Sequence, residues 1–138
     1  MRADINKFSL KNSEFIKGLA TFLHAEKPEE VHQITKTIEP VIVNSAASTG
    51  DINAFNYLKE IGVNFGVVDY RGRNCLHVAA ISRNFEIADF VLKNANNIDI
   101  DYDKIDLAGC SPLYYAIAYD NIDIAQLLVL KGAELYCP

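Results

Sequence analysis

The sequence predicts an all-α solenoid, that is, a row of stacked helix pairs. A turn followed by two short amphipathic helices occupies residues 69–94 and begins again at residue 106. Pairs of small residues, Ala46-Ala47 and Ala79-Ala80, lie 33 residues apart and leave room for helices to approach closely. Half of the 138 residues are hydrophobic, which is enough for a stacked core. A unit repeated at this spacing is typical of a solenoid.

The central copy of this unit shows each element most clearly. Residues 69–72 contain Asp and Gly, which favour a turn. Asn74 stands where a helix N-cap is expected. The apolar face of the first helix is then formed by Leu76, Ala79 and Ala80. A turn at Arg83-Asn84 leads to a second helix over residues 85–93, whose inner stripe is Ile87, Ala88, Val91 and Leu92.

The same residue pattern recurs further along the chain. Residues 106–116 align with residues 69–79 at a spacing of 37, so the loop over residues 94–105 carries a four-residue insertion. We expect the last outer helix over residues 122–130 and the first outer helix over residues 52–61. The inner helix of the first copy, over residues 41–49, has lost its turn motif.

These units resemble the ankyrin repeat, a turn plus two helices with a period of 33. Ser111-Pro112-Leu113-Tyr114 and Asn74-Cys75-Leu76-His77 are altered forms of its Thr-Pro-Leu-His motif, and Gly132-Ala133 matches its Gly-Ala ending. The resemblance implies three ankyrin repeats in residues 40–138, at about 41–68, 69–105 and 106–138.

Residues 1–39 stand outside the repeats and are expected to hold an N-terminal segment and two capping helices. The first helix should run from Ser13 to about Ala25. The second should begin at Pro28 and end near Glu39, because Pro40 disfavours a continuing helix. Packed ahead of the first repeat, this pair would shield its apolar face from water.

Composition argues against several classes of protein. The formal net charge of −5 comes without a basic stripe, which excludes a typical nucleic-acid binder. No apolar run reaches the length of a membrane span. Three widely spaced cysteines, Cys75, Cys110 and Cys137, are typical of reduced thiols, so we expect a cytoplasmic location.

No residue pattern supports a catalytic site, a cofactor or a metal. The alternation of Asp99, Asp101 and Asp103 suggests a calcium loop, but Lys104 and Cys110 occupy the places that need Gly and Glu. We therefore expect a solvated acidic loop. No cysteine pair has zinc spacing, and the glycines do not form a phosphate-binding loop.

In ankyrin stacks, the turn tips and the exposed side of the inner helices bind protein partners. The resemblance therefore implies these partner-binding candidates: Tyr70, Arg71, Arg73, Leu107, Ala108, Ser45, Ser48, Ile81, Ser82, Tyr115 and Tyr119. Tyr and Arg are favoured at interaction hot spots. We expect Arg71 and Arg73 to serve binding rather than stability, and His77, at the motif histidine, to form hydrogen bonds between neighbouring turns.

The carboxyl-terminal repeat is unusual, because residues 122–130 are apolar on nearly every side. A terminal repeat should have a polar outer face. Either a further repeat is missing from this chain, or this end docks on a partner or self-associates.

One stretch has a narrower resemblance. Residues 43–80, with the link Phe65-Gly66-Val67-Val68-Asp69, are similar to the first ankyrin repeats of animal type I, cytosolic L-asparaginases, also described as lysophospholipases. The catalytic threonine motifs of that family, Thr-Gly-Gly-Thr and Gly-Thr-Asp-Thr, do not occur here. The resemblance implies the non-catalytic, C-terminal part of such an amidohydrolase. The alternatives are a free-standing ankyrin adaptor and a chain that takes part in amide hydrolysis itself.

Overall fold

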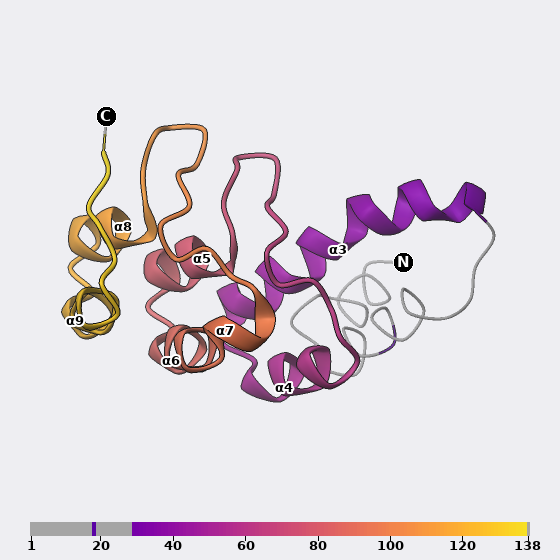
Figure 1. Cartoon of the computed structure of the whole chain (residues 1–138), viewed down its shortest axis with the longest axis horizontal. Helices are drawn as coiled ribbons and strands as arrows, with labels where there is room; N and C mark the ends of the chain where they lie inside the picture. The colour runs from indigo at the N-terminus through magenta and orange to yellow at the C-terminus, as the bar shows by residue number, and fades with distance from the viewer. Residues whose placement is uncertain (1–17, 19–28, 138) are drawn as a thin grey trace, which may run out of the picture.

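The computed structural model describes residue 18 and residues 29–137 of the chain. Within residues 29–137 it contains helices and no strand, as the sequence predicted. The helices, labelled as in Figure 1, are α3 (Glu29–Thr49), α4 (Ile52–Glu60), α5 (Cys75–Ser82), α6 (Phe85–Lys93), α7 (Ala95–Ile98), α8 (Pro112–Ala118) and α9 (Ile122–Leu130). Apart from residue 18, which is helical, the helix expected over residues 13–25 lies outside the described residues.

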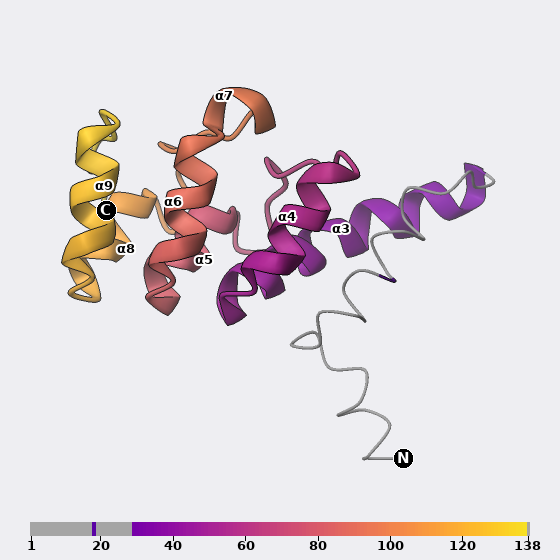
Figure 2. The same ribbon diagram turned by 90° about the horizontal axis from the view of Figure 1, so that it is seen from below.

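The helices form two layers. The inner layer is the carboxyl-terminal part of α3 followed by α5 and α8, and the outer layer is α4, α6 and α9 (Figure 1). Figure 2 shows the outer helices side by side in the same order. The loops that join one repeat to the next extend away from both layers on one side (Figure 1). The fold is therefore the predicted all-α stack of helix pairs.

The predicted break at Pro40 is wrong, because α3 runs without interruption from Glu29 to Thr49 with Pro40 inside it. A proline within a helix removes one backbone hydrogen bond and costs about 3 kcal/mol. Ile42 and Val43, two and three residues after Pro40, are at most 1% exposed to solvent. Each contributes roughly 1.5–3 kcal/mol of burial, which offsets that cost. The helix before the first repeat and the inner helix of that repeat are thus one element, part of which projects beyond α4 (Figures 1 and 2).

Small residues let the helices of the inner layer pack closely against one another. Ala46, Ala47, Ala79, Ala80 and Ala116 are all fully buried where α3, α5 and α8 pack in sequence. Larger apolar side chains fill the space between the layers, among them Phe55, whose ring centroid lies 5.3 Å from that of Phe65 and 5.9 Å from that of Phe90. The core is therefore continuous along the stack.

The turn between the two helices of each repeat uses the same left-handed backbone position. Gly50, Arg83 and Asp120 occupy equivalent places and have φ values of 73°, 62° and 60°. Asn84 and Asn121 follow Arg83 and Asp120, and their side-chain amides donate to carbonyls of the preceding repeat, Ala47 and Ser48 for Asn84 and Ala80 for Asn121. These bonds fix the position of each repeat relative to the preceding one.

The insertion predicted in residues 94–105 forms the short helix α7. Asp99, which follows it, takes a left-handed conformation with φ 53°. In the part of the chain that the structure describes, no helix is both long and apolar enough to cross a membrane.

Candidate contact surfaces

The two complete turns of the stack, residues 69–73 and 106–110, have the same architecture. In the first turn, one carboxylate oxygen of Asp69 accepts the backbone N–H groups of Arg71 at 2.9 Å and Arg73 at 3.0 Å. In the second turn, Asp106 accepts those of Ala108 and Cys110, both at 3.0 Å. Each aspartate thus satisfies backbone donors that the turn would otherwise leave unpaired, and this keeps the turn rigid.

The two turns are also joined at their tips. The backbone N–H of Leu107 donates to the carbonyl of Arg71 at 2.9 Å. Gly72 makes this approach possible, since a Cβ there would lie 3.1 Å from the Leu107 nitrogen. Tyr70 and Leu107 are 81% and 80% exposed, so the joined tips present an aromatic and an aliphatic side chain to solvent. Arg71 and Ala108 are exposed beside them, and the Arg71 guanidinium lies 5.3 Å from the Tyr70 ring centroid.

Arg73 and Tyr115, predicted as contact residues, instead lie in a polar cluster between the second and third repeats. The Arg73 guanidinium forms an ion pair with Asp106 at 3.3 Å and donates to the Tyr115 hydroxyl at 3.1 Å. The Tyr115 hydroxyl donates to Asp106 at 2.5 Å. Tyr115 is only 6% exposed, and the Arg73 side chain is 20% exposed.

The cluster shifts the pKa values of its members. Burial alone would raise the pKa of Asp106, but hydrogen bonds from Tyr115, the Cys110 backbone and Arg73 outweigh burial and lower it. Burial, together with the hydrogen bond to Asp106, raises the pKa of Tyr115 to about 12. Asp106 therefore stays charged, and Tyr115 stays neutral, at physiological pH.

His77 links the same two repeats, which confirms its predicted structural role. The backbone N–H of Asn74 donates to His77 Nδ1 at 3.1 Å, so Nδ1 carries no proton. The proton is therefore on Nε2, which lies 3.0 Å from the Cys110 carbonyl and donates to it. Burial lowers the pKa of His77, so the neutral ring that these bonds require is the stable form. Asn44, at the equivalent place in the first repeat, donates to the Arg73 carbonyl at 3.1 Å.

The inner-helix candidates lie along one side of α3, α5 and α8, with unequal exposure. Ser48 is exposed, and Tyr119 is 48% exposed. Three others are half-buried: Ser45, Ile81 and Ser82. The carbonyl of Tyr119 accepts a hydrogen bond from the Arg83 guanidinium at 3.2 Å. The accessible part of this face is thus concentrated at Ser48 and Tyr119.

The acidic loop after α7 uses its carboxylates internally. Asp101 accepts the backbone N–H of Asp103, and Asp103 accepts that of Glu134. Among the described residues, no group of three or more His, Cys, Asp or Glu side chains could hold a metal ion. Cys75 is fully buried, and burial raises the pKa of its thiol to about 12. Neither feature offers reactive chemistry.

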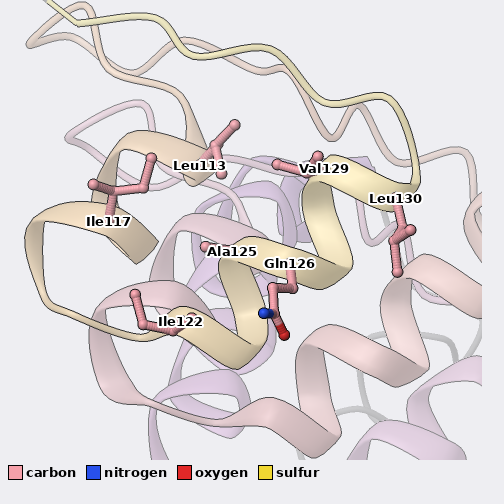
Figure 3. Close-up of a pocket in the computed structure, with 7 residues that line it drawn as sticks. All are labelled: Leu113, Ile117, Ile122, Ala125, Gln126, Val129 and Leu130. Atoms are coloured by element: carbon pink, nitrogen blue, oxygen red, sulfur yellow. The ribbon is translucent and has the colours of Figure 1, made fainter.

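The sequence analysis noted that residues 122–130 are apolar, but it missed a groove that α8 and α9 form together at the end of the stack. The groove has a volume of about 410 Å³ and is lined by Leu113, Ile117, Ile122, Ala125, Gln126, Val129 and Leu130 (Figure 3). We call this surface the end face. The contribution of α8 could have been found by comparing positions between repeats, since Ile117 stands where Ala80 stands one repeat earlier.

Comparison with known proteins agrees with this architecture. The family described as "Ankyrin repeats (3 copies)" matches residues 15–137. An L-asparaginase from Dirofilaria immitis is 40% identical over 126 residues, which cover 91% of this chain and 21% of that protein. A serine/threonine-protein kinase 12 from Arabidopsis thaliana is 30% identical over 113 residues, covering 81% of this chain and 23% of that protein. A putative ankyrin repeat protein from Rickettsia bellii is 27% identical over 107 residues, covering 77% and 58%.

The chain thus spans between about a fifth and three fifths of the length of these relatives, which share the repeats and differ in name. The family match spans the stack of helix pairs, whose turn tips and end face are open to contact. The chain therefore belongs to the ankyrin-repeat family and is a protein–protein interaction module of that kind.

Proposed function

We propose that this chain is the non-catalytic contact region of a cytoplasmic L-asparaginase-like amidohydrolase, and that its turn tips bind the remainder of that enzyme as their protein partner. The similarity to the Dirofilaria immitis L-asparaginase supports the parent enzyme. The observation that carries the contact role is the pair Tyr70 and Leu107, more than three-quarters exposed on two turns that a backbone hydrogen bond holds together. A rigid apolar surface loses little conformational entropy on binding.

Within this proposal, the predicted contact residues divide into three groups. The exposed ones are Tyr70, Arg71, Leu107, Ala108, Ser48 and Tyr119, and the half-buried ones are Ser45, Ile81 and Ser82. Tyrosine and arginine at the centre of such a surface are the residue types that contribute most to binding free energy. Arg73 and Tyr115 support the surface from beneath, because they tie Asp106 of the second turn to the first turn.

The test is a calorimetric titration of this chain with the Dirofilaria immitis L-asparaginase from which the matched region has been deleted. We expect binding, and we expect the double substitution Tyr70→Ala and Leu107→Ala to weaken it by about 30-fold or more, since the loss of a single hot spot already costs about 2 kcal/mol. The matched control is Asn53→Ala, an exposed change on α4.

Two results would contradict this part of the proposal. Absence of binding by the unsubstituted chain would remove the enzyme as its partner. Equal affinities for the double variant and the control would place the contact elsewhere on the molecule.

A catalytic role is the competing interpretation, and the isolated chain tests it directly. We expect no release of ammonia from asparagine, because the threonine motifs Thr-Gly-Gly-Thr and Gly-Thr-Asp-Thr do not occur in this chain. Cys75 is also fully buried, and its thiol is held neutral. Turnover above that of a heat-denatured sample would overturn the non-catalytic assignment.

We propose a second contact, self-association through the carboxyl-terminal repeat, as in a free-standing adaptor. Its support is the exposure of four aliphatic residues on the end face: Ile117 at 50%, Ile122 at 54%, Val129 at 59% and Leu130 at 83%. Leaving such side chains in water forfeits roughly 1.5–3 kcal/mol for each one that could be fully buried. Association would recover part of that free energy.

A further inference from the structure

The carboxyl-terminal segment, residues 133–137, is attached to the residue just before α8. The backbone N–H of Ser111 donates to the Tyr136 carbonyl at 3.0 Å, and the Tyr136 N–H donates to the Ser111 hydroxyl at 3.1 Å. The same hydroxyl donates to the Glu134 carbonyl at 3.0 Å. Because these hydrogen bonds join the segment to a single residue from two places, its position beside α8 is fixed.

These bonds bring two cysteines side by side. Cys110 directly precedes Ser111, and Cys137 directly follows Tyr136. Figure 1 shows the segment running from α9 toward the side of the loops, whereas the chain before α8 runs from a loop toward the helix, so the two stretches are antiparallel. In an antiparallel pair, the residues next to such a hydrogen bond face each other with Cα atoms about 4.5 Å apart. A disulfide needs a Cα separation of about 4.4–6.8 Å, so the two backbones are within reach of one.

The backbone of Cys110 leaves its side chain free to face the segment. Its N–H donates to the Asp106 carboxylate, and its carbonyl accepts from the Asp106 N–H, both at 3.0 Å. Arg73, at the equivalent position one repeat earlier, extends its side chain along the stack to the following turn. Cys110 therefore points the same way, toward residues 133–137, and is only 3% exposed.

The two thiols have different access to solvent. Cys137 is exposed, so a dissolved oxidant can reach it. Cys110 is buried, and its thiol is held by a contact with the Ala108 carbonyl at 3.8 Å, which is a weak hydrogen bond. Rotation about the side-chain torsion of Cys110 releases that bond. The exposed thiol is thus placed to react first, and the buried thiol to react with it second.

We propose that Cys110 and Cys137 are a thiol pair that forms a reversible disulfide within the chain, with a small disulfide such as oxidised glutathione as the oxidant. The Cys137 thiolate attacks one glutathione sulfur, which breaks the glutathione disulfide and releases one glutathione thiolate. The Cys110 thiolate then attacks the Cys137 sulfur of the mixed disulfide and releases the second glutathione thiolate. The protons of the two protein thiols pass to the glutathione thiolates, so two protein thiols are oxidised and one glutathione disulfide is reduced.

The bond would enclose α8 and α9, which lie between the two cysteines in the sequence. Closing this loop restricts the unfolded chain, so the oxidised third repeat should be more stable than the reduced one. A disulfide in the cytoplasm is usually transient, and this one would form only when the glutathione pool is oxidised. It is independent of the turn-tip contact, because it needs no partner protein.

The test exposes the reduced full chain to buffers with increasing ratios of oxidised to reduced glutathione. Free thiols are then alkylated, and the digested peptides are identified by mass spectrometry. We expect a disulfide between the peptides that contain Cys110 and Cys137, with no covalent link to a second copy. Cys75, which is fully buried, should be alkylated only after unfolding.

Two variants separate the roles of the thiols. Cys110→Ser removes the second thiol, so oxidation should stop at a mixed disulfide of Cys137 with glutathione. The matched control is Cys75→Ala, which should form the internal disulfide like the unsubstituted chain. The oxidised chain should melt roughly 5 °C or more above the reduced chain, and Cys110→Ser should show no such difference.

Three results would overturn the inference. They are a stable mixed disulfide on Cys137 of the unsubstituted chain, a disulfide between Cys137 of two copies in place of the internal bond, and equal oxidation of Cys75 and Cys110. All three are read from the unsubstituted chain, so they remain decisive even if a variant does not fold.

Discussion

The seam between the second and third repeats and the end face of the third repeat are built from equivalent positions, yet they differ in what fills them. The seam combines alanines with directed hydrogen bonds, such as His77 to the Cys110 carbonyl and Asn121 to the Ala80 carbonyl. The end face carries larger aliphatic residues and one amide, Gln126. The comparison shows that hydrogen bonds fix how successive repeats align, whereas the exposed apolar area of the end face is available for contact with another molecule.

The largest expected difference between seam and end face comes from one pair of equivalent truncations. Leu92→Ala should lower the free energy of unfolding by about 2–5 kcal/mol, because Leu92 is 1% exposed and its removal leaves a cavity. Val129→Ala should change it by no more than about 0.5 kcal/mol in dilute solution, because Val129 is 59% exposed. Urea unfolding measures both. Equal losses would mean that the end face is covered within the monomer.

Two neighbouring arginines give the next largest contrast. Arg73→Ala should cost roughly 1.5–3 kcal/mol, because it leaves the carboxylate of Asp106 buried without its ion-pair partner. Arg71→Ala should cost less than about 0.5 kcal/mol, since Arg71 is exposed. The structure thus revises the expectation that both arginines serve binding alone. Thermal and urea unfolding of the two variants would decide, and a stable Arg73→Ala protein would remove the seam role.

The glycines of the two turns sharpen the same comparison at smaller magnitude. Gly72 and Gly109 have φ values of 76° and 82°, so alanine at either place costs about 1–2 kcal/mol in backbone strain. At Gly72 the new Cβ would also meet the Leu107 nitrogen at 3.1 Å, whereas at Gly109 nothing lies within 4 Å. We expect Gly72→Ala to be the more destabilising of the two. The reverse order would show that the turn tips are not in fixed contact.

The smallest effect is a pH dependence located in the seam. Because burial lowers the pKa of His77, the unfolded chain binds a proton on this residue before the folded protein does. Stability should therefore fall as the pH drops below about 6.5, the usual histidine pKa, toward the lower pKa of the folded state. His77→Gln keeps a donor for the Cys110 carbonyl without titrating. The stability of this variant should therefore fall less than that of the unsubstituted protein between about pH 7 and about pH 5. Identical pH profiles would show that His77 adds nothing to the acid sensitivity.

Much of the fold could be predicted from the sequence because the repeats provide internal alignment. The recurrence of residues 69–79 at 106–116 located α5 and α8, and the bounds of α6 and α9 were predicted residue for residue. Asn74 was predicted as an N-cap, and its side chain accepts the backbone N–H groups of Leu76 and His77. Where a signal occurs twice, local propensity and tertiary packing agree.

The features that could not be predicted are those in which long-range packing overrides the local preference of a residue. Pro40 reads locally as a helix stop, but burial of Ile42 and Val43 carries the helix through it. Arg73 and Tyr115 have side chains typical of binding residues, yet Arg73 bonds to Asp106, 33 residues away, and to Tyr115, 42 residues away. Asn84 and Asn121 recur in sequence, but the carbonyls that they bind become apparent only when the repeats are stacked.

Amide hydrogen exchange at low and high protein concentration tests the difference between seam and end face most directly. We predict that amides of α5 and α6 exchange only through global unfolding at both concentrations, while amides of α9 become more protected as the concentration rises. Concentration-independent exchange of α9, or faster exchange of α5 and α6 than of α9, would contradict the account.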